Sequence, residues 1–252
     1  MRNVWTLASR EYHRFFTSPI AYVVAFVTFL TLGIIFGLTI LVYSQNAAGG
    51  GFGAPPSAPD LTGVTGTFTF LMVLSIPAIT MRLISDENRM GTMELLLTAP
   101  VRDWELVVGK WLGGFLFMLT LIAVTVIYAF VLNALITPGL DQLQLLAQFL
   151  GLILVAGAFL ALGVGVSAMF SNQIAAFFVS LGLFVFLWWL IGFPAQYVTA
   201  GAPFFSYLDM SSHFNNHLNS GVVALSDLAY YLSLIALGLF AGTTAVEARR
   251  WS

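Results

Sequence analysis

Cysteine is absent from this chain of 252 residues, and charged residues make up only 8% of it. Without cysteine there are no disulfide bonds, no thiolate metal ligands and no cysteine nucleophile. The low charge content argues against a soluble domain, in which about a quarter of the residues are charged. No run of basic residues is present that would bind nucleic acid. Because 59% of the residues are hydrophobic, we predict an integral membrane protein.

Six apolar runs are long enough to cross a bilayer. A helix needs about 20 apolar residues to do so, because the hydrocarbon layer is about 30 Å thick and each helical residue rises about 1.5 Å. We therefore predict an all-α membrane protein that forms a single domain over residues 1–252. The third run is long enough to project beyond the bilayer or to break near Asn133. The predicted spans are approximately residues 19–44, 62–83, 106–136, 145–170, 173–192 and 227–246.

The lysine and arginine residues indicate the orientation of these spans. All nine lie on one side of the predicted bilayer: before the first span, around the connection between the second and third spans, and after the sixth span. The positive-inside rule assigns that side to the cytoplasm. We therefore expect a multi-pass protein of the cytoplasmic (inner) membrane, with both termini in the cytoplasm.

Two segments outside the spans are predicted to form short helices. Residues 2–18 place apolar side chains at helical spacing between charged ones, which is typical of an amphipathic helix in the headgroup plane. A loosely ordered tail is the alternative for this segment. Residues 193–226 are rich in aromatic and small residues but contain no apolar run long enough to span, so we expect interfacial or re-entrant helices there.

The apolar cores of the predicted spans contain no Asp, Glu, Lys, Arg or His. Ion-coupled carriers usually keep such groups at membrane depth, so the sequence argues against a proton or sodium relay. Gly109-Lys110 is followed by Trp111, where a phosphate-binding loop requires Ser or Thr. We expect neither an active site nor a bound cofactor in this chain. Lys110 is expected to extend toward the membrane surface.

Asp209, His213 and His217 follow one another at intervals of four residues on the predicted outer side. On a continuous helix these side chains would share one face. Zinc sites use such spacing, but they need three or four ligands, and the pattern is not the HExxH motif. We expect a polar helix face at the membrane surface and no metal, with a zinc site as the alternative.

Pairs of glycines four residues apart occur in three of the predicted spans. Such pairs allow two helices to approach closely. They either pack spans within the chain or form the seam of a dimer, and the sequence does not choose between these arrangements. The pairs are Gly33/Gly37, Gly109/Gly113 and Gly238/Gly242.

Residues 82–110 hold nine of the twenty charged residues, although they connect two spans. Each charge would cost about 2.5–3.5 kcal/mol at the bilayer centre, so we expect this connection in water. The second span is predicted to continue as a helix past Arg82 into the water, where Gly91 favours a stop. Thr92 then caps a short helix, and Pro100 turns the chain after it. Asp103 is expected to cap the third span.

The short helix carries more apolar surface than a water-exposed helix needs. Its apolar residues either pack on the bilayer or fill a groove on a partner. The residues alone do not decide between these two arrangements. They are Met93, Leu95, Leu96 and Leu97.

The same connection contains the pattern Glu87-x-x-x-Gly91-Thr92-x-Glu94-Leu95-Leu96-x-x-x-Pro100-Val101. This pattern resembles the cytoplasmic motif of ABC-2 type permeases, particularly those of the gliding-motility-type branch. Two further stretches are similar to that branch: residues 15–24, and residues 227–240 followed by residues 247–251. The resemblance therefore covers both termini and the centre of the chain. Asn88 is a departure, because the family often has a basic residue there.

The resemblance implies a permease subunit that pairs with a second copy of itself or with a related membrane subunit. A cytoplasmic ABC ATPase dimer, which binds ATP and magnesium, would attach through residues 84–104, here named the coupling segment. An accessory membrane protein is a further candidate partner. The residues that the resemblance assigns to ATPase coupling are Glu87, Gly91, Thr92, Met93, Glu94, Leu95, Leu96 and Pro100.

Within that set, the resemblance implies three roles. The apolar residues would be buried in the ATPase, Glu87 and Glu94 would pair with its basic groups, and Gly91 and Pro100 would fix two bends. Two other functions stay open on the residues alone: a membrane scaffold that recruits a cytoplasmic partner without transporting anything, and an ion-coupled carrier. The sequence does not define the substrate.

Overall fold

The computed structural model describes residues 2–48, 60–90, 102–136, 139–197 and 201–250, and within these ranges the chain is helical, without strands. Six helical segments are long and apolar enough to cross a membrane, which confirms the predicted all-α membrane protein with six spans. The helices at the centre of these segments are α2 (Pro19–Ala48), α3 (Thr62–Thr80), α6 (Asp103–Leu135), α7 (Gln142–Met169), α8 (Gln173–Val185) and α12 (Leu225–Arg250).

Shorter helices fill the connections. The predicted N-terminal helix is α1 (Arg2–Thr17), and a short helix, α4 (Ser85–Met90), follows α3. Between α8 and α12 the chain forms a series of short helical pieces, as predicted, whereas their placement at the membrane surface stays a prediction. These pieces are η1 (Phe186–Leu190), α9 (Phe193–Tyr197), α10 (Ala202–Leu208), α11 (Met210–Ser212), η2 (His213–His217) and η3 (Leu218–Ser220).

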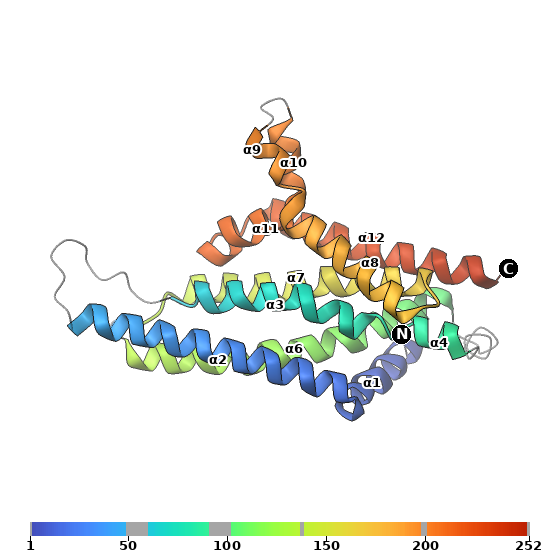
Figure 1. Ribbon diagram of the computed structural model, residues 1–252, viewed down its shortest axis with the longest axis horizontal. Coiled ribbons are helices and arrows are strands. Elements are labelled where there is room, and N and C mark those ends of the chain that lie inside the picture. Colours follow the sequence, from blue (N-terminus) through green and yellow to red (C-terminus); the bar gives the residue numbers. More distant parts are fainter. Residues whose placement is uncertain (1, 49–59, 91–101, 137–138, 198–200, 251–252) are drawn as a thin grey trace.

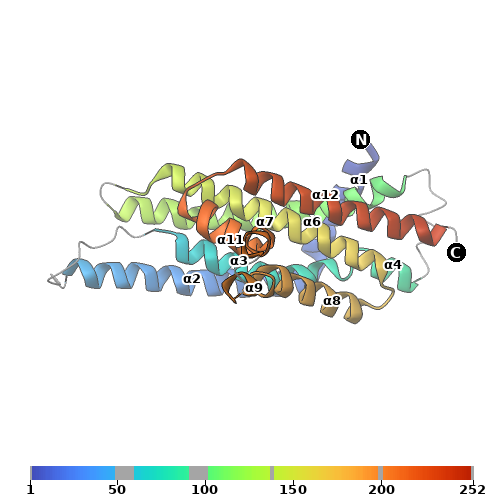
Figure 2. The same cartoon turned by 90° about the horizontal axis from the view of Figure 1, so that it is seen from above.

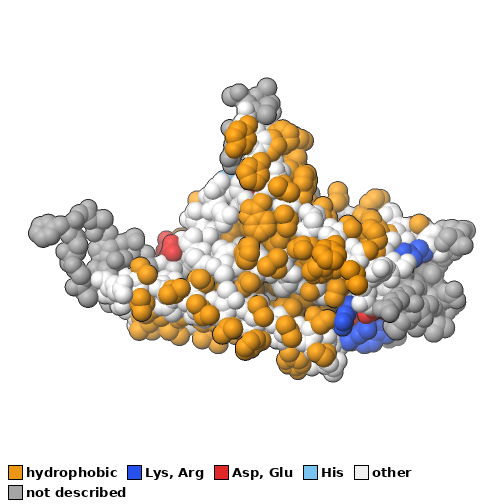
Figure 3. Space-filling model, in the orientation of Figure 1, with side chains coloured by type: hydrophobic (Ala, Val, Ile, Leu, Met, Phe, Trp, Pro, Cys, Tyr) orange, Lys and Arg blue, Asp and Glu red, His pale blue; other side chains and the backbone are white. Residues whose placement is uncertain are grey.

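The long helices run along the long axis of the molecule (Figure 1). Both termini and α4 lie toward one end of this axis in Figure 1, while α2 ends and α7 begins at the other. On the face drawn in Figure 3, the Lys and Arg side chains lie at the end with the termini, and apolar side chains cover the flank. This separation suits a protein that places its charged end in water and its flank in lipid. Which compartment the charged end faces stays a prediction.

Helix α7 forms the centre of the bundle. It contacts α3, α6, α8 and α12 (Figure 2), and most of its residues are buried. Glycine and alanine allow these contacts to be close: a Cβ added to Gly238 of α12 would lie 2.5 Å from the backbone of Ala161 in α7. The Gly238/Gly242 pair therefore packs two spans within the chain and is not available as a dimer seam.

The outside of the bundle is apolar. Helices α2 and α8 are the least buried of the six spans. Helices α9 and α10 project away from the bundle, as Figure 1 shows, and they also carry exposed aromatic side chains. Such a surface is stable in lipid or against another apolar protein surface but not in water. Among the large exposed apolar residues are Phe26, Phe130, Phe178, Phe204 and Phe240.

Two expectations about the helix ends are refined, and one, the capping of the third span by Asp103, is wrong. Helix α3 ends at Thr80 and a turn separates it from α4, although the candidate span runs from Thr62 to Glu87. Helix α6 continues to Leu135, which excludes the break near Asn133; the Asn133 Oδ1 accepts a hydrogen bond from the Leu140 N–H at 2.9 Å. The residue before α6 is Arg102 and not Asp103, and its N–H donates to the Glu105 carboxylate.

Candidate functional site

Seven of the eight residues predicted to couple to an ATPase lie outside the described residues: Gly91, Thr92, Met93, Glu94, Leu95, Leu96 and Pro100. The eighth, Glu87, lies on α4. The structure thus describes the two ends of the coupling segment, at α4 and at the start of α6. The candidate site is the set of contacts that hold these two ends.

Lys110 lies at the centre of this site. Its Nζ is 2.8 Å from Oε1 of Glu87 on α4 and 3.2 Å from Oε1 of Glu11 on α1. The Lys110 side chain is 0% exposed, and those of Glu11 and Glu87 are 2% and 9% exposed. A charge in such a position is stable only when it is paired. We call Glu11, Glu87 and Lys110 the anchor cluster, because it joins three helices.

Two arginines of α1 accompany the anchor cluster. The guanidinium groups of Arg10 and Arg14 lie 3.6 and 3.8 Å from the Glu11 carboxylate, and both side chains are more than half exposed. Pairs with such exposed groups contribute little to stability, about 0–1 kcal/mol. The arginines nevertheless add positive charge beside a cluster that has two carboxylates and one ammonium.

A close approach of α1 to α6 brings Glu11 to Lys110. A Cβ added to Gly113 would lie 2.7 Å from the Glu11 Cβ, and one added to Gly109 would lie 2.8 Å from the Leu7 Cβ. Only glycine leaves space for α1 at these two positions. The Gly109/Gly113 pair is thus an intramolecular contact, which answers a question that the sequence left open.

The far end of the coupling segment is held by the same two helices. Oε2 of Glu105 on α6 accepts hydrogen bonds from the Arg102 N–H at 3.1 Å and from Nδ2 of Asn3 on α1 at 3.3 Å. Glu105 also lies in the first turn of α6, where a negative charge suits the helix dipole. The first end of the coupling segment is therefore tied to α6 directly and to α1 through Lys110, and the second end is tied to α1 through Glu105.

Helix α7 holds the turn before α4. The Oγ of Ser167 accepts hydrogen bonds from the N–H groups of Ile84 and Ser85, each at 3.2 Å. These backbone groups are buried where α3 has ended, so they need an acceptor from elsewhere in the chain. Through Ser167, the position of α4 depends on the central helix of the bundle as well as on the anchor cluster.

The anchor cluster corrects two expectations. Lys110 does not extend to the membrane surface, and the start of α4 does not lie in water, since Ser85 and Glu87 are buried. Glu87 anchors α4 within the chain, and its predicted contact with an ATPase stays a prediction. Glu11 was missed as a site residue, although the sequence carried one signal: Glu11 follows Ala8 by three residues and precedes Phe15 by four, so it lies on the apolar face of the predicted helix.

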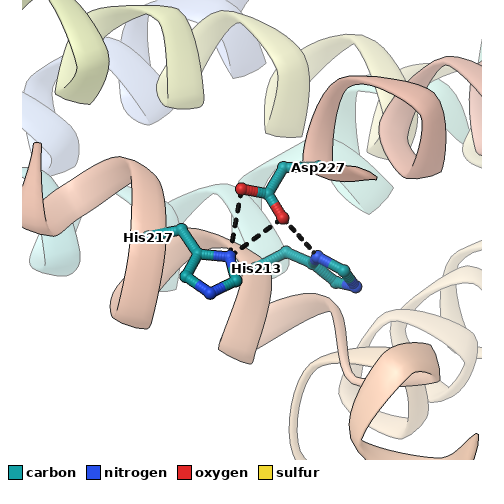
Figure 4. A group of neighbouring side chains, drawn as sticks. All are labelled: His213, His217 and Asp227. Carbon is teal, nitrogen blue, oxygen red and sulfur yellow. Dashed lines mark hydrogen bonds and ion pairs between the residues drawn. The ribbon is translucent and has the colours of Figure 1, made fainter. Parts of the chain in front are cut away.

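A second polar cluster lies where η2 meets the start of α12. Nδ1 of His213 is 2.7 Å from Oδ1 of Asp227, and Nδ1 of His217 is 3.0 and 3.1 Å from the two Asp227 oxygens. Figure 4 shows both imidazole rings directed at the one carboxylate. Asp227 and His213 are buried, whereas the His217 side chain is 44% exposed. We call these three residues the histidine cluster.

The prediction that Asp209, His213 and His217 share one helix face is therefore wrong for Asp209. Asp209 precedes α11, and its Oδ1 accepts hydrogen bonds from the Ser211 N–H at 3.0 Å and from the Ser211 hydroxyl at 2.8 Å. The chain then changes from α11 to the π-helical turn η2, so the assumed continuous α-helix does not form. Asp227 was missed because it belongs to another helix.

Tyrosines of α12 hold the histidine cluster in place. The Tyr230 ring stacks on His213 with ring centres 4.3 Å apart, and its hydroxyl donates to the Leu208 carbonyl at 2.7 Å. The Tyr231 hydroxyl donates to the Met210 carbonyl at 3.0 Å. The short helices before α12 are thus fixed to it by several polar contacts.

A family model described as ABC-2 family transporter protein matches residues 5–247 of the chain. This range contains the anchor cluster, the histidine cluster and nearly all of the six candidate spans. The match does not distinguish the gliding-motility-type branch from others. No curated protein matches the chain at a significant level.

Proposed function

Since the chain belongs to the ABC-2 transporter family, we propose that it is the permease subunit of an ATP-driven transporter. The sequence contains no nucleotide-binding or catalytic motif, so the ATP and magnesium belong to a separate cytoplasmic ATPase dimer. In this proposal a second copy of the chain, or a related membrane subunit, completes the translocation pathway. The gliding-motility-type branch remains our proposal for the subfamily.

The coupling segment is where we propose that the ATPase binds. The observation that supports this is the anchor cluster, in which Lys110 contacts Glu87 near the start of the segment and lies on the helix that follows it. Lys110 also contacts Glu11, and Glu105 at the end of the segment contacts Asn3. A force applied to the coupling segment would therefore act on α1 and α6 together.

Burial makes the anchor cluster a firm connection. Removing one partner of a buried ion pair costs about 3–5 kcal/mol, because the other charge is left unpaired. A movement that separated α4 from α6 would incur a similar cost. When ATP binding draws the ATPase subunits together, α1, α4 and the start of α6 should therefore move as one unit, with the bundle rearranging around it.

The apolar residues of the coupling segment supply the contact in this proposal. Met93, Leu95 and Leu96 would be buried in a groove of the ATPase, where about 25 cal/mol is gained for each Å² of apolar surface removed from water. Glu94 would pair with a basic group at the edge of that groove. The anchor cluster then transmits the movement of the groove to the bundle.

The test compares coupling-segment variants with matched controls. Leu96→Ala and Glu94→Gln should weaken the copurification of an ATPase with the full chain, and should lower transport relative to ATP hydrolysis. Leu237→Ala and Glu247→Gln make the same replacements at exposed positions of α12. These controls should change neither the copurification of the ATPase nor the ratio of transport to ATP hydrolysis. A partner that does not hydrolyse ATP would favour the scaffold function, and variants that behave like wild type would overturn the proposed coupling.

A further inference from the structure

The histidine cluster has the composition of a metal site. We propose that His213, His217 and Asp227 bind a divalent transition-metal ion of the zinc type. The three side chains offer two imidazole nitrogens and one carboxylate oxygen, all within 4.8 Å of one another. This donor set is typical of zinc sites with three protein ligands and one water. Calcium and magnesium prefer oxygen ligands only, so they should bind poorly here.

The distances are close to those that zinc requires. Bonds of about 2.0–2.2 Å at tetrahedral angles place two ligand atoms about 3.3 Å apart. The Nδ1 atoms of His213 and His217 lie 2.7 and 3.0 Å from Oδ1 of Asp227. Rotations that move these atoms apart by a few tenths of an ångström would admit the ion.

The hydrogen bonds of His213 identify the nitrogen that would bind the ion. Its Nε2 lies 2.8 Å from the Tyr207 carbonyl oxygen, which can only accept, so Nε2 carries a proton and donates. Metal-binding histidines usually donate their second N–H to a carbonyl or carboxylate in this way. Nδ1 is therefore left to face Oδ1 of Asp227 at 2.7 Å, a position in which either a proton or a metal ion lies between the two atoms.

The surroundings favour a fixed site with an accessible entrance. Asp227 is buried at the start of α12, and Tyr230 stacks on His213, so two of the three ligands have little freedom to move. The half-exposed His217 lies at the opening, where an ion can enter and where water can supply a fourth ligand. A bound ion would join η2 to α12 at the side of the bundle that the sequence predicts to be outside.

The experiment uses the full chain, purified in detergent and treated with a chelator that is then removed. Zn²⁺ is added, and the retained metal is counted per chain by elemental analysis. We expect about one ion per chain, as for a single three-ligand site. Co²⁺ in the same site should give the visible absorption of a tetrahedral ion. Mg²⁺ at the same concentration should not compete.

Variants separate this site from incidental binding. His217→Ala should weaken Zn²⁺ binding at least about 10-fold, and it leaves the buried contact of His213 with Asp227 in place. His13→Ala is the matched control, because His13 is the one remaining histidine and is exposed on α1 at the other end of the bundle. It should bind Zn²⁺ like wild type.

Thermal unfolding gives a second readout that does not depend on transport. Zn²⁺ should raise the Tm of wild type and of His13→Ala but not that of His217→Ala. Asp227→Asn should also lose the effect. Retention of no Zn²⁺ by wild type, or equal binding by His217→Ala, would overturn the proposal and leave the histidine cluster as a proton-mediated contact.

Discussion

Replacement of Lys110 by methionine tests the anchor cluster directly. Lys110→Met removes the ammonium group and leaves the carboxylates of Glu11 and Glu87 facing each other in a buried space. Their Oε1 atoms lie 3.2 and 2.8 Å from the Lys110 Nζ, so they are separated by about 6 Å at most. Two unit charges at that distance repel by about 3 kcal/mol at an effective dielectric constant of about 20.

The expected loss of stability is about 3–5 kcal/mol, which is typical when one partner of a buried ion pair is removed. For a chain of this size, the Tm should fall by about 6–20 °C. Thermal unfolding of the purified protein in detergent measures this change. Arg82→Met is the matched control, because Arg82 is an exposed cation near the same turn, and it should change the stability by less than about 1 kcal/mol.

A triple variant distinguishes lost charge pairing from lost packing. Glu11→Gln and Glu87→Gln, combined with Lys110→Met, remove all three charges while keeping side chains of similar size. With all three charges removed, no uncompensated charge is left in the buried space, so this variant should regain most of the lost stability. The reasoning is refuted if Lys110→Met unfolds at the wild-type temperature, or if the triple variant is no more stable than the single one.

Two further variants test the contacts around the anchor cluster. Gly113→Leu should displace α1, because even a Cβ at this position would lie 2.7 Å from a side chain of α1. Limited proteolysis should then cut α1 faster than in wild type. Gly37→Leu is the control: nothing lies within 4 Å of a Cβ at that position, so this variant should be cut at the wild-type rate. Ser167→Ala should reduce the free energy of unfolding by about 1–3 kcal/mol, because two buried N–H groups lose their acceptor. Ser44→Ala, at an exposed position of α2, is its control in thermal unfolding, and equal stabilities would show that the turn before α4 does not need Ser167.

The spans could be predicted because each is encoded by residues that adjoin in sequence. An apolar run of the required length has few alternatives to a membrane helix. The short helices between α8 and α12 could also be predicted, since Pro194, Gly201 and Pro203 interrupt the pattern there. Local sequence therefore sufficed for the elements and for their order.

The two clusters could not be predicted in the same way, because their members come from distant parts of the chain. Glu11 and Lys110 are 99 residues apart, and the Gly109/Gly113 pair beside Lys110 indicates a close helix approach without identifying α1 as the helix that packs there. The expectation that Lys110 extends to the surface rested on its position near a span end alone. Asp209 was grouped with the histidines on the assumption of one continuous helix, whereas the chain folds back and brings Asp227 instead.

The central claim, that the coupling segment binds an ATPase, is tested most directly by site-specific crosslinking. The chain contains no cysteine, so Leu96→Cys introduces a unique thiol to which a photoreactive maleimide can be attached in the full-length protein. Gln45→Cys is the control, because Gln45 is exposed near the end of α2, at the end of the bundle away from α4. We predict that position 96, and not position 45, crosslinks to a protein that hydrolyses ATP, and that the yield changes when ATP binds. Crosslinking to no protein, to a protein without ATPase activity, or equally from both positions would contradict the account.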